Sequence, residues 1–107
     1  MSLYADYLQE MGWGIVESPR GFATYKITGP SCYIQDVYVK PKHRKFECAT
    51  NFGDIIADIA RSAGCNELTC TVDATNPGWQ GRREFLLKYG FKIITEKQEY
   101  LVFSKEI

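Results

Sequence analysis

Four cationic side chains crowd one short stretch of the chain: Lys40, Lys42, Arg44 and Lys45. The stretch joins an expected strand to an expected helix. Free backbone N–H groups and the helix dipole favour an anion at a helix N-terminus. The position therefore predicts a phosphate cradle. A solvated basic loop that binds nothing would have the same composition, and the loop taken alone favours that simpler interpretation.

A carboxylate suited to general-base chemistry lies just upstream, at Asp36. Its strand, residues 32–40, changes phase: Cys32 and Ile34 alternate in one register and Val37 and Val39 in the other. A β-bulge produces such a slip and often lies beside an active site. A strand covered on both faces would need no alternation and explains the pattern equally well. Asp36 is thus a candidate base or a solvent-facing acid, and Asp73 is a weaker candidate.

The elements that must position these residues follow from periodicity and turn residues. A helix is expected at 3–11, and strands at 13–17, 22–28 and 32–40 form an antiparallel meander. A second helix, about 49–63, carries an apolar stripe made of Ala49, Phe52, Ile55, Ile56, Ile59, Ala60 and Ala63. A strand at 68–73, a helix at 79–89 and strands at 91–95 and 100–105 complete the order.

The strand–helix–strand segment at 32–73 leaves room for a parallel right-handed crossover. The sequence therefore predicts the α+β class, with a mixed sheet of about six strands flanked by helices. Its 107 residues suit one domain, 1–107, and no linker divides them. Trp13, Trp79 and Phe85 are expected in the core.

Composition excludes several functions. The 13 basic and 13 acidic residues give zero net charge, which makes nucleic-acid binding improbable. No apolar run approaches the length of a membrane span, and the N-terminus resembles no secretion signal, so a cytoplasmic protein is expected. The cysteines form no Cys-x-x-Cys and His43 is the single histidine. Hence we expect reduced thiols and no metal site.

Taken in order, these features resemble the GNAT superfamily of acyl-CoA N-acyltransferases. The segment 38–41, Tyr-Val-Lys-Pro, resembles a bulged strand ending in Val-x-Pro, and 44–49 resembles the following Arg/Gln-x-x-Gly-x-Gly/Ala. Asn76 and the run 87–91, Leu-Lys-Tyr-Gly-Phe, resemble the later motif. The similarity covers about residues 13–107. The short chain and its ending also resemble small bacteriophage-encoded GNAT-like proteins.

The resemblance implies an N-acetyltransferase that moves an acetyl group from acetyl-CoA to a small-molecule or protein amine by direct attack. Acetyl-CoA would lie between the strands at 32–40 and 68–73, with its pantetheine arm along Val37, Tyr38 and Val39. A backbone N–H near Val39 would polarise the thioester. Asp36 would be the base and Tyr89 the acid, and Asn76 would order the cofactor. The pyrophosphate would lie on backbone N–H groups of Arg44, Lys45, Phe46, Glu47, Cys48, Ala49 and Thr50.

Three departures from the family pattern bear on activity. Glu47 replaces a loop glycine, and its repulsion from one phosphate charge at roughly 4 to 6 Å is about 1 to 4 kcal/mol. Nearby cations, or a turn of the carboxylate toward Arg44, would offset it. Leu86 replaces the usual tyrosine acid. Tyr89 lies one helical turn away, although a tyrosine on an apolar face is more often core.

The third departure is N-terminal truncation relative to the family: about twelve residues stand where a strand and a helix normally precede the meander. This would expose the site unless a second subunit of a homodimer covers it. Cys48 lies at the helix start, although its N–H matters more than its sulfur. The alternative to an enzyme is a catalytically degenerate GNAT-fold protein that acts as an interaction or structural module.

Overall fold

The structure, a computed structural model, describes residues 2–44 and 46–107, without the side chain of Phe46. The predicted cradle residue Lys45 lies outside the described residues. Within the described residues, none of the helices combines the length and apolar character needed to cross a membrane.

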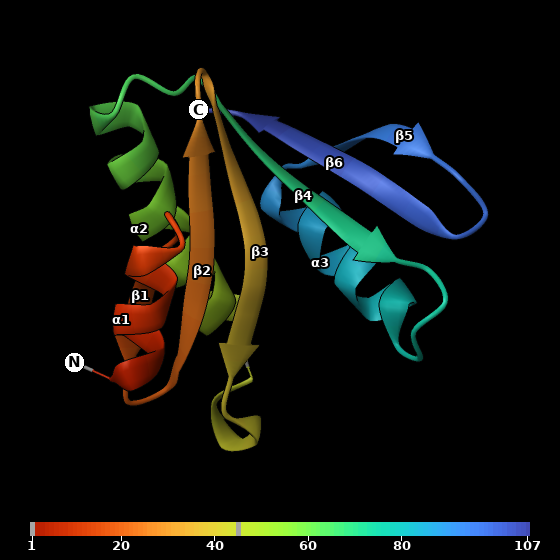
Figure 1. Cartoon of the computed structure of the whole chain (residues 1–107). Helices are drawn as coiled ribbons and strands as arrows, with labels where there is room; N and C mark the ends of the chain where they lie inside the picture. Colours follow the sequence, from red (N-terminus) through yellow and green to blue (C-terminus); the bar gives the residue numbers. More distant parts are fainter. Residues whose placement is uncertain (1, 45) are drawn as a thin grey trace.

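Within the described part of the chain, three α-helices and six strands form the fold (Figure 1). The sheet order is β1-β2-β3-β4-β6-β5, with β3 and β4 parallel and every other neighbouring pair antiparallel. The predicted α+β class and mixed six-stranded sheet are thereby confirmed. The elements are α1 (Leu3–Glu10), β1 (Gly14–Ser18), β2 (Gly21–Thr28), β3 (Ser31–Val39), a short 3₁₀ turn η1 (Pro41–His43), α2 (Phe46–Ser62), β4 (Glu67–Asp73), α3 (Trp79–Tyr89), β5 (Lys92–Glu96) and β6 (Tyr100–Glu106).

The two central strands, β3 and β4, separate soon after they pair. Only Ser31–Tyr33 of β3 pairs with Glu67–Thr69 of β4. Beyond these three residue pairs the strands diverge and form a V in Figure 1. The facing edges of the two strands therefore lack ladder hydrogen bonds to each other along most of their length.

The phase change in β3 is a β-bulge. Thr24 of β2 lies opposite Asp36, but the next residue, Tyr25, lies opposite Ile34, so Gln35 is an extra residue. The bulge interpretation of the sequence is confirmed. Because neighbouring strand residues point to opposite faces, Asp36 and Tyr38 lie on one face of the sheet.

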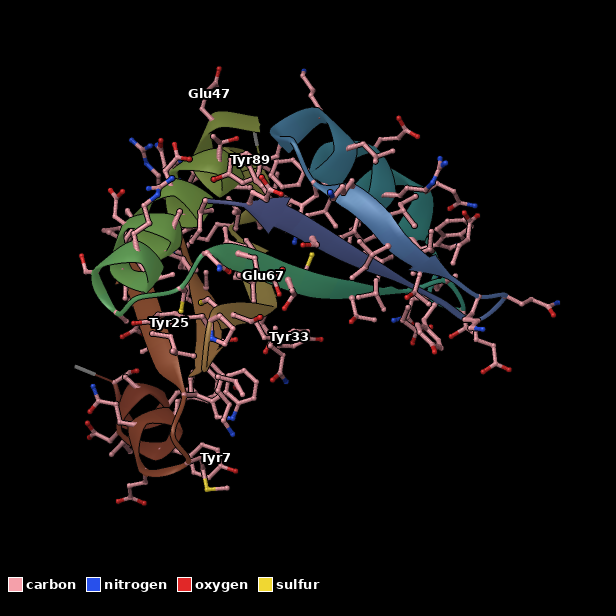
Figure 2. All side chains as sticks on the ribbon, turned by 90° about the horizontal axis from the view of Figure 1, so that it is seen from above. Tyr7, Tyr25, Tyr33, Glu47, Glu67 and Tyr89 are labelled. Atoms are coloured by element: carbon pink, nitrogen blue, oxygen red, sulfur yellow. The ribbon has the colours of Figure 1, made fainter. Side chains whose placement is uncertain are left out.

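The helices cover the sheet on both sides. In Figure 2, α1 lies against one face, and α2 and α3 lie against the other. On the α2 side, Ile34 and Val39 join Phe52 and Ile56 in the buried core. Asp36 and Tyr38 therefore lie on the α1 side, opposite the core.

Two predictions about α2 need correction. The helix begins at Phe46 rather than Ala49, because Cys48 extends the buried row one turn before Phe52. The stripe is also rotated: Ile55 is 45% exposed, whereas Ala57 is buried. The small side chain of Ala57 allows close helix-to-sheet packing that a hydrophobicity pattern does not register.

The Tyr89 side chain ties α3 to α2. None of the α3 residues is fully buried, and the chain leaves the helix at Gly90, whose φ of 115° suits glycine. The Tyr89 hydroxyl donates a 2.6 Å hydrogen bond to Asp54 Oδ1 on α2. It fits only because α2 has a glycine beneath it: a Cβ on Gly53 would lie 2.8 Å from the Tyr89 oxygen.

We expect Gly53→Ala to destabilise the fold relative to Gly81→Ala. Alanine in a helix interior gains about 0.5–1 kcal/mol over glycine, and a Cβ at Gly81 of α3 meets open space. At Gly53 the same gain is opposed by displacement of Tyr89 and loss of its charged hydrogen bond. Urea unfolding should show Gly53→Ala less stable than Gly81→Ala by about 1 to 3 kcal/mol. Equal stabilities would contradict the close approach.

Candidate active site

The divergence of β3 and β4 opens a cavity of about 750 Å³. This size lies within the usual range for small-molecule and cofactor sites, about 300–1,000 Å³. β3 and β4 form its two sides, and α2 and α3 provide the remaining walls. Described residues from each element line it, among them Val37, Val39, Ala49, Cys70, Phe85 and Tyr89.

Unpaired backbone lies along the two strand edges of this cavity. β3 continues from Ile34 to Val39, and β4 from Cys70 to Asp73, past the point where their pairing stops. Backbone N–H and C=O groups on such edges need partners, which ligand or water can supply. An extended ligand that carries amide groups would satisfy both edges.

The N-terminal end of α2 opens onto the same cavity, which Ala49 and Arg44 line. Arg44 Nε donates a 2.9 Å hydrogen bond to the Val39 carbonyl, and its guanidinium carbon lies 5.7 Å from the centre of the Tyr38 ring. These contacts hold the Arg44 cation at the end of β3.

Glu47 does not turn back toward this end of the helix. Its side chain is exposed and projects away from the molecule in Figure 2. The ion pair with Arg44 considered from the sequence does not form, because Arg44 binds the Val39 carbonyl instead. The carboxylate thus extends into solvent, where water weakens its repulsion of an anion at the helix terminus.

Thr50, in the second turn of α2, gives a further sign of an unmet polar partner. Its hydroxyl oxygen is buried, and it has no hydrogen-bond partner among the described residues. A buried polar atom in this state is uncommon in native proteins. Thr50 is not among the described residues that line the cavity, so the cavity's suitability for a polar, extended, anionic ligand rests on the helix terminus and the unpaired strand edges.

Asp36 lies on the opposite side of β3, in a second cavity of about 210 Å³. Thr24 positions it: the Asp36 backbone N–H donates to the threonine hydroxyl at 3.1 Å, and that hydroxyl donates to Asp36 Oδ2 at 3.4 Å. The bulge residue Gln35 lines both cavities.

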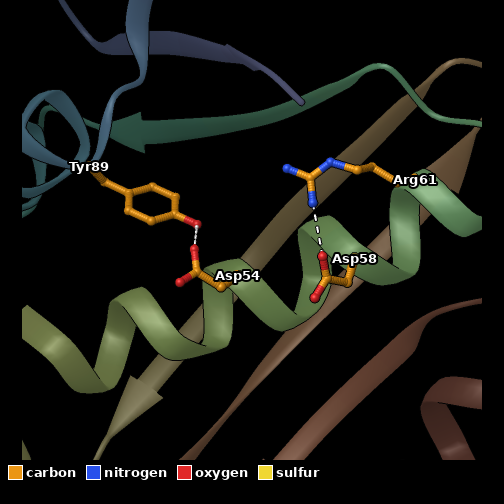
Figure 3. A network of polar contacts seen from close by, with 4 residues as sticks. All are labelled: Asp54, Asp58, Arg61 and Tyr89. Carbon is orange, nitrogen blue, oxygen red and sulfur yellow. Dashed lines mark hydrogen bonds and ion pairs between the residues drawn. The ribbon is translucent and has the colours of Figure 1, made fainter.

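Tyr89 lines the large cavity, but its hydroxyl is directed at Asp54 (Figure 3). Burial, the hydrogen bond to Asp54 and the Asp54 charge all raise the pKa of Tyr89 above its ordinary value. In this conformation Tyr89 holds its proton more tightly than a free tyrosine does. Its role as an acid stays a prediction, and Leu86 also lines the cavity.

Two other titratable groups near the cavity are unsuited to act as nucleophile or base. Burial raises the pKa of the Cys70 thiol to about 12, so it is protonated at neutral pH. Hydrogen bonds from the Thr75 hydroxyl and backbone N–H lower the pKa of Asp73, which makes its carboxylate a weak base.

The remaining candidate residues are distributed around the site. Tyr38 presents its ring to the α1 face, beside Phe22, and Cys48 belongs to the core. Asn76 does not line either cavity within the described chain; its backbone shapes the turn before α3. The site residues proposed from the sequence are therefore only partly gathered in one place.

Sequence reasoning missed two cavity-lining residues of α3 and misplaced two aromatic residues. Arg82 and Lys88 line the large cavity, but α3 has too little amphipathic pattern to show which side faces inward. Phe85 and Trp13 were expected in the core; Phe85 lines the large cavity and Trp13 the small one. Trp79 does pack, half-buried, against the core.

Comparison with protein families gives one match, to the acetyltransferase (GNAT) family, over residues 2–91. No curated protein sequence matches the chain significantly. Many solved structures share its fold. A GNAT-family protein from Desulfovibrio desulfuricans superposes with a TM-score of 0.81 at 14% identity, covering 94% of this chain and 74% of that one.

Two further solved structures share the fold. The PaiA N-acetyltransferase of Thermoplasma acidophilum, in complex with coenzyme A, gives a TM-score of 0.73 at 19% identity. The match covers 82% of this chain but only 54% of that one. The anti-CRISPR protein AcrVA5 gives 0.69 at 18% identity, covering 85% of this chain and 97% of that one. At these identities the likeness shows the fold.

We expect the hydrogen bond between Tyr89 and Asp54 to be a stabilising link between α3 and α2. In a double-mutant cycle with Tyr89→Phe and Asp54→Ala, urea unfolding should give a coupling energy of about 0.5 to 1.5 kcal/mol. The exposed pair Asp58–Arg61 on α2, at 2.9 Å, is the matched control and should couple more weakly. Coupling no larger than in the control would contradict the link.

Proposed function

We propose that this chain, which belongs to the GNAT family of acetyltransferases, transfers an acetyl group from acetyl-CoA to an amine. The observation that carries the proposal is the pair of unpaired strand edges, β3 beyond Tyr33 and β4 beyond Thr69, facing one cavity. The N-terminal end of α2 lies at the same cavity. The proposal also draws on the coenzyme A complex of the Thermoplasma protein.

The residues that line the large cavity suit acetyl-CoA as the donor. Backbone groups of Val37, Tyr38 and Val39 would pair with the amides of the pantetheine arm, as a strand partner would. N–H groups of the first turn of α2, together with Arg44, would hold the pyrophosphate. When bound, acetyl-CoA supplies a thioester whose carbonyl carbon accepts the amine nitrogen while the carbon–sulfur bond breaks and its electron pair leaves with sulfur.

The chain's own residues would have three tasks in this reaction. Backbone N–H groups near Val39 would stabilise negative charge on the carbonyl oxygen. Asp36 would take the proton that the amine loses. A thiol of ordinary pKa, about 8.5, leaves readily as thiolate, so a general acid is of less consequence, and Tyr89 would act as one only after release from Asp54.

Acetyl-CoA should stabilise the protein against thermal unfolding. At 100 times its Kd it would add about 2.7 kcal/mol, a rise in Tm of about 10 °C or more for a domain of this size. Arg44→Ala should reduce the rise, because it removes a cation that lines the cavity just before the start of α2. Arg61→Ala, at the far end of α2, should leave the rise unchanged.

An unchanged Tm at millimolar acetyl-CoA would overturn the proposed donor. If Tm rises as much in Arg44→Ala as in the natural chain, donor binding is supported but the assigned position of the pyrophosphate is wrong. Release of free thiol on addition of an amine then tests the transfer itself.

Asp36→Asn should lower kcat by about 100-fold or more, the usual contribution of a general base. Acetyl-CoA binding should be unchanged, because Asp36 lies on the other side of β3 from the large cavity. Asp73→Asn is the matched control: its carboxylate is already held by Thr75, and kcat should change little. If the two substitutions change kcat by similar factors, Asp36 is not the general base.

A further inference from the structure

A row of aromatic rings crosses the α1 side of the sheet near the end of β3. Tyr4 of α1 meets Phe22 of β2 edge to face, with ring centres 5.7 Å apart. Phe22 lies opposite Tyr38 of β3, and their ring centres are also 5.7 Å apart. Tyr4 and Tyr38 are 42% and 43% exposed. This aromatic row therefore presents ring surface to solvent.

Four cations adjoin the Tyr38 end of the aromatic row. The Arg44 guanidinium carbon lies 5.7 Å from the centre of the Tyr38 ring. The backbone N–H of Lys40 donates a 2.7 Å hydrogen bond to the Arg20 carbonyl, which brings the turn between β1 and β2 alongside the end of β3. Lys42 belongs to the adjoining turn η1. All four side chains are exposed, and within the described residues none of them pairs with a carboxylate.

These parts come from separate segments of the chain and gather at one end of the molecule. In Figure 1 the start of α1, the turn between β1 and β2 and the turn after β3 all lie at the lower end. Rings and unpaired cations thus share one surface.

We propose that this surface, the aromatic row with Arg20, Lys40, Lys42 and Arg44, binds a single-stranded nucleic acid. Unpaired bases stack on the rings and the cations bind the backbone phosphates, the combination that single-strand binding without sequence preference uses. A double helix stacks its bases on one another and cannot offer their faces to these rings. Among the described residues of this surface only Arg44 also lines the large cavity, so the inference stands apart from acetyl transfer.

The zero net charge of the chain does not oppose this binding. Salt screens charges beyond about 8 Å at physiological ionic strength, so a phosphate responds to the local cluster of cations. Two acids flank the aromatic row, Glu17 of β1 and Asp36 of β3. Each accepts a hydrogen bond from a hydroxyl, Glu17 from Ser2 at 3.1 Å and Asp36 from Thr24 at 3.4 Å. Their repulsion of phosphate directs the nucleic-acid backbone along the cationic end of the row.

Fluorescence anisotropy with two short labelled strands tests the surface. One strand is oligothymidylate, and the other is abasic with the same number of phosphates. Oligothymidylate should bind with a Kd of about 1 to 100 µM, the usual range for sequence-independent binding. The abasic strand should bind about tenfold more weakly, because it has no bases to stack.

Substitutions separate stacking from charge. Tyr38→Ala should weaken binding of oligothymidylate about tenfold and leave the abasic strand unaffected, whereas Tyr38→Phe should bind both strands as the natural chain does. Tyr4→Ala repeats the test on α1, where β3 is untouched. Lys42→Ala should weaken both strands and reduce the slope of log affinity against log salt by about 0.7. Lys97→Ala, in the exposed turn between β5 and β6, is the matched control and should change neither.

Three results would overturn the proposal. The first is equal affinity for the two strands, which would leave charge alone. The second is unchanged binding of oligothymidylate by both Tyr38→Ala and Tyr4→Ala, each with its Tm preserved. The third is tighter binding of a polyglutamate peptide of matched charge, which would assign the surface to an acidic polypeptide. Absence of binding by every probe would exclude an anionic polymer altogether.

Discussion

The arrangement of the cavity and its walls depends on the short stretch over which β3 and β4 pair before they diverge. At the closed end, three residue pairs join them, and Glu67 accepts hydrogen bonds from Ser31 at 2.5 Å and Ser104 at 3.4 Å. At the open side, Tyr89 joins α3 to α2 through Asp54. Since the two halves of the sheet are linked at these places, the cavity between them has fixed walls even though its strand edges are unpaired.

The bulge at Gln35 gives the two faces of β3 different chemistry. Without the extra residue, strict alternation would carry the side-chain phase of Cys32 and Ile34 through to Asp36. With it, Ile34, Val37 and Val39 share the side of α2, and Asp36 points to α1. A carboxylate and an apolar cavity wall thus occupy neighbouring positions of one strand without competing for the same space.

The sequence predicted the elements well, because alternation, helical stripes and glycine stops are local signals. The bulge is one of two equal interpretations of the phase change in β3, and the register with β2 decides in its favour. The sequence did not predict which side of α3 faces the cavity, since Arg82, Phe85 and Lys88 show no clear apolar stripe. Nor did it predict that Tyr89 binds Asp54, because that contact depends on the missing side chain of Gly53, far away in sequence. The position of Trp13 depends on how α1 packs, which no spacing in the sequence encodes.

The unpaired edges of β3 and β4 also bear on the solubility of the protein. A free strand edge on the outside of a sheet invites another polypeptide to add a strand, which leads to aggregation. Here two such edges face each other within one cavity, and α2 and α3 cover one side of it. A narrow ligand can reach them, whereas a second folded chain, with its own side chains on both faces, meets the helices first. On the side that α2 and α3 cover, the two unpaired edges are thus shielded from other folded chains.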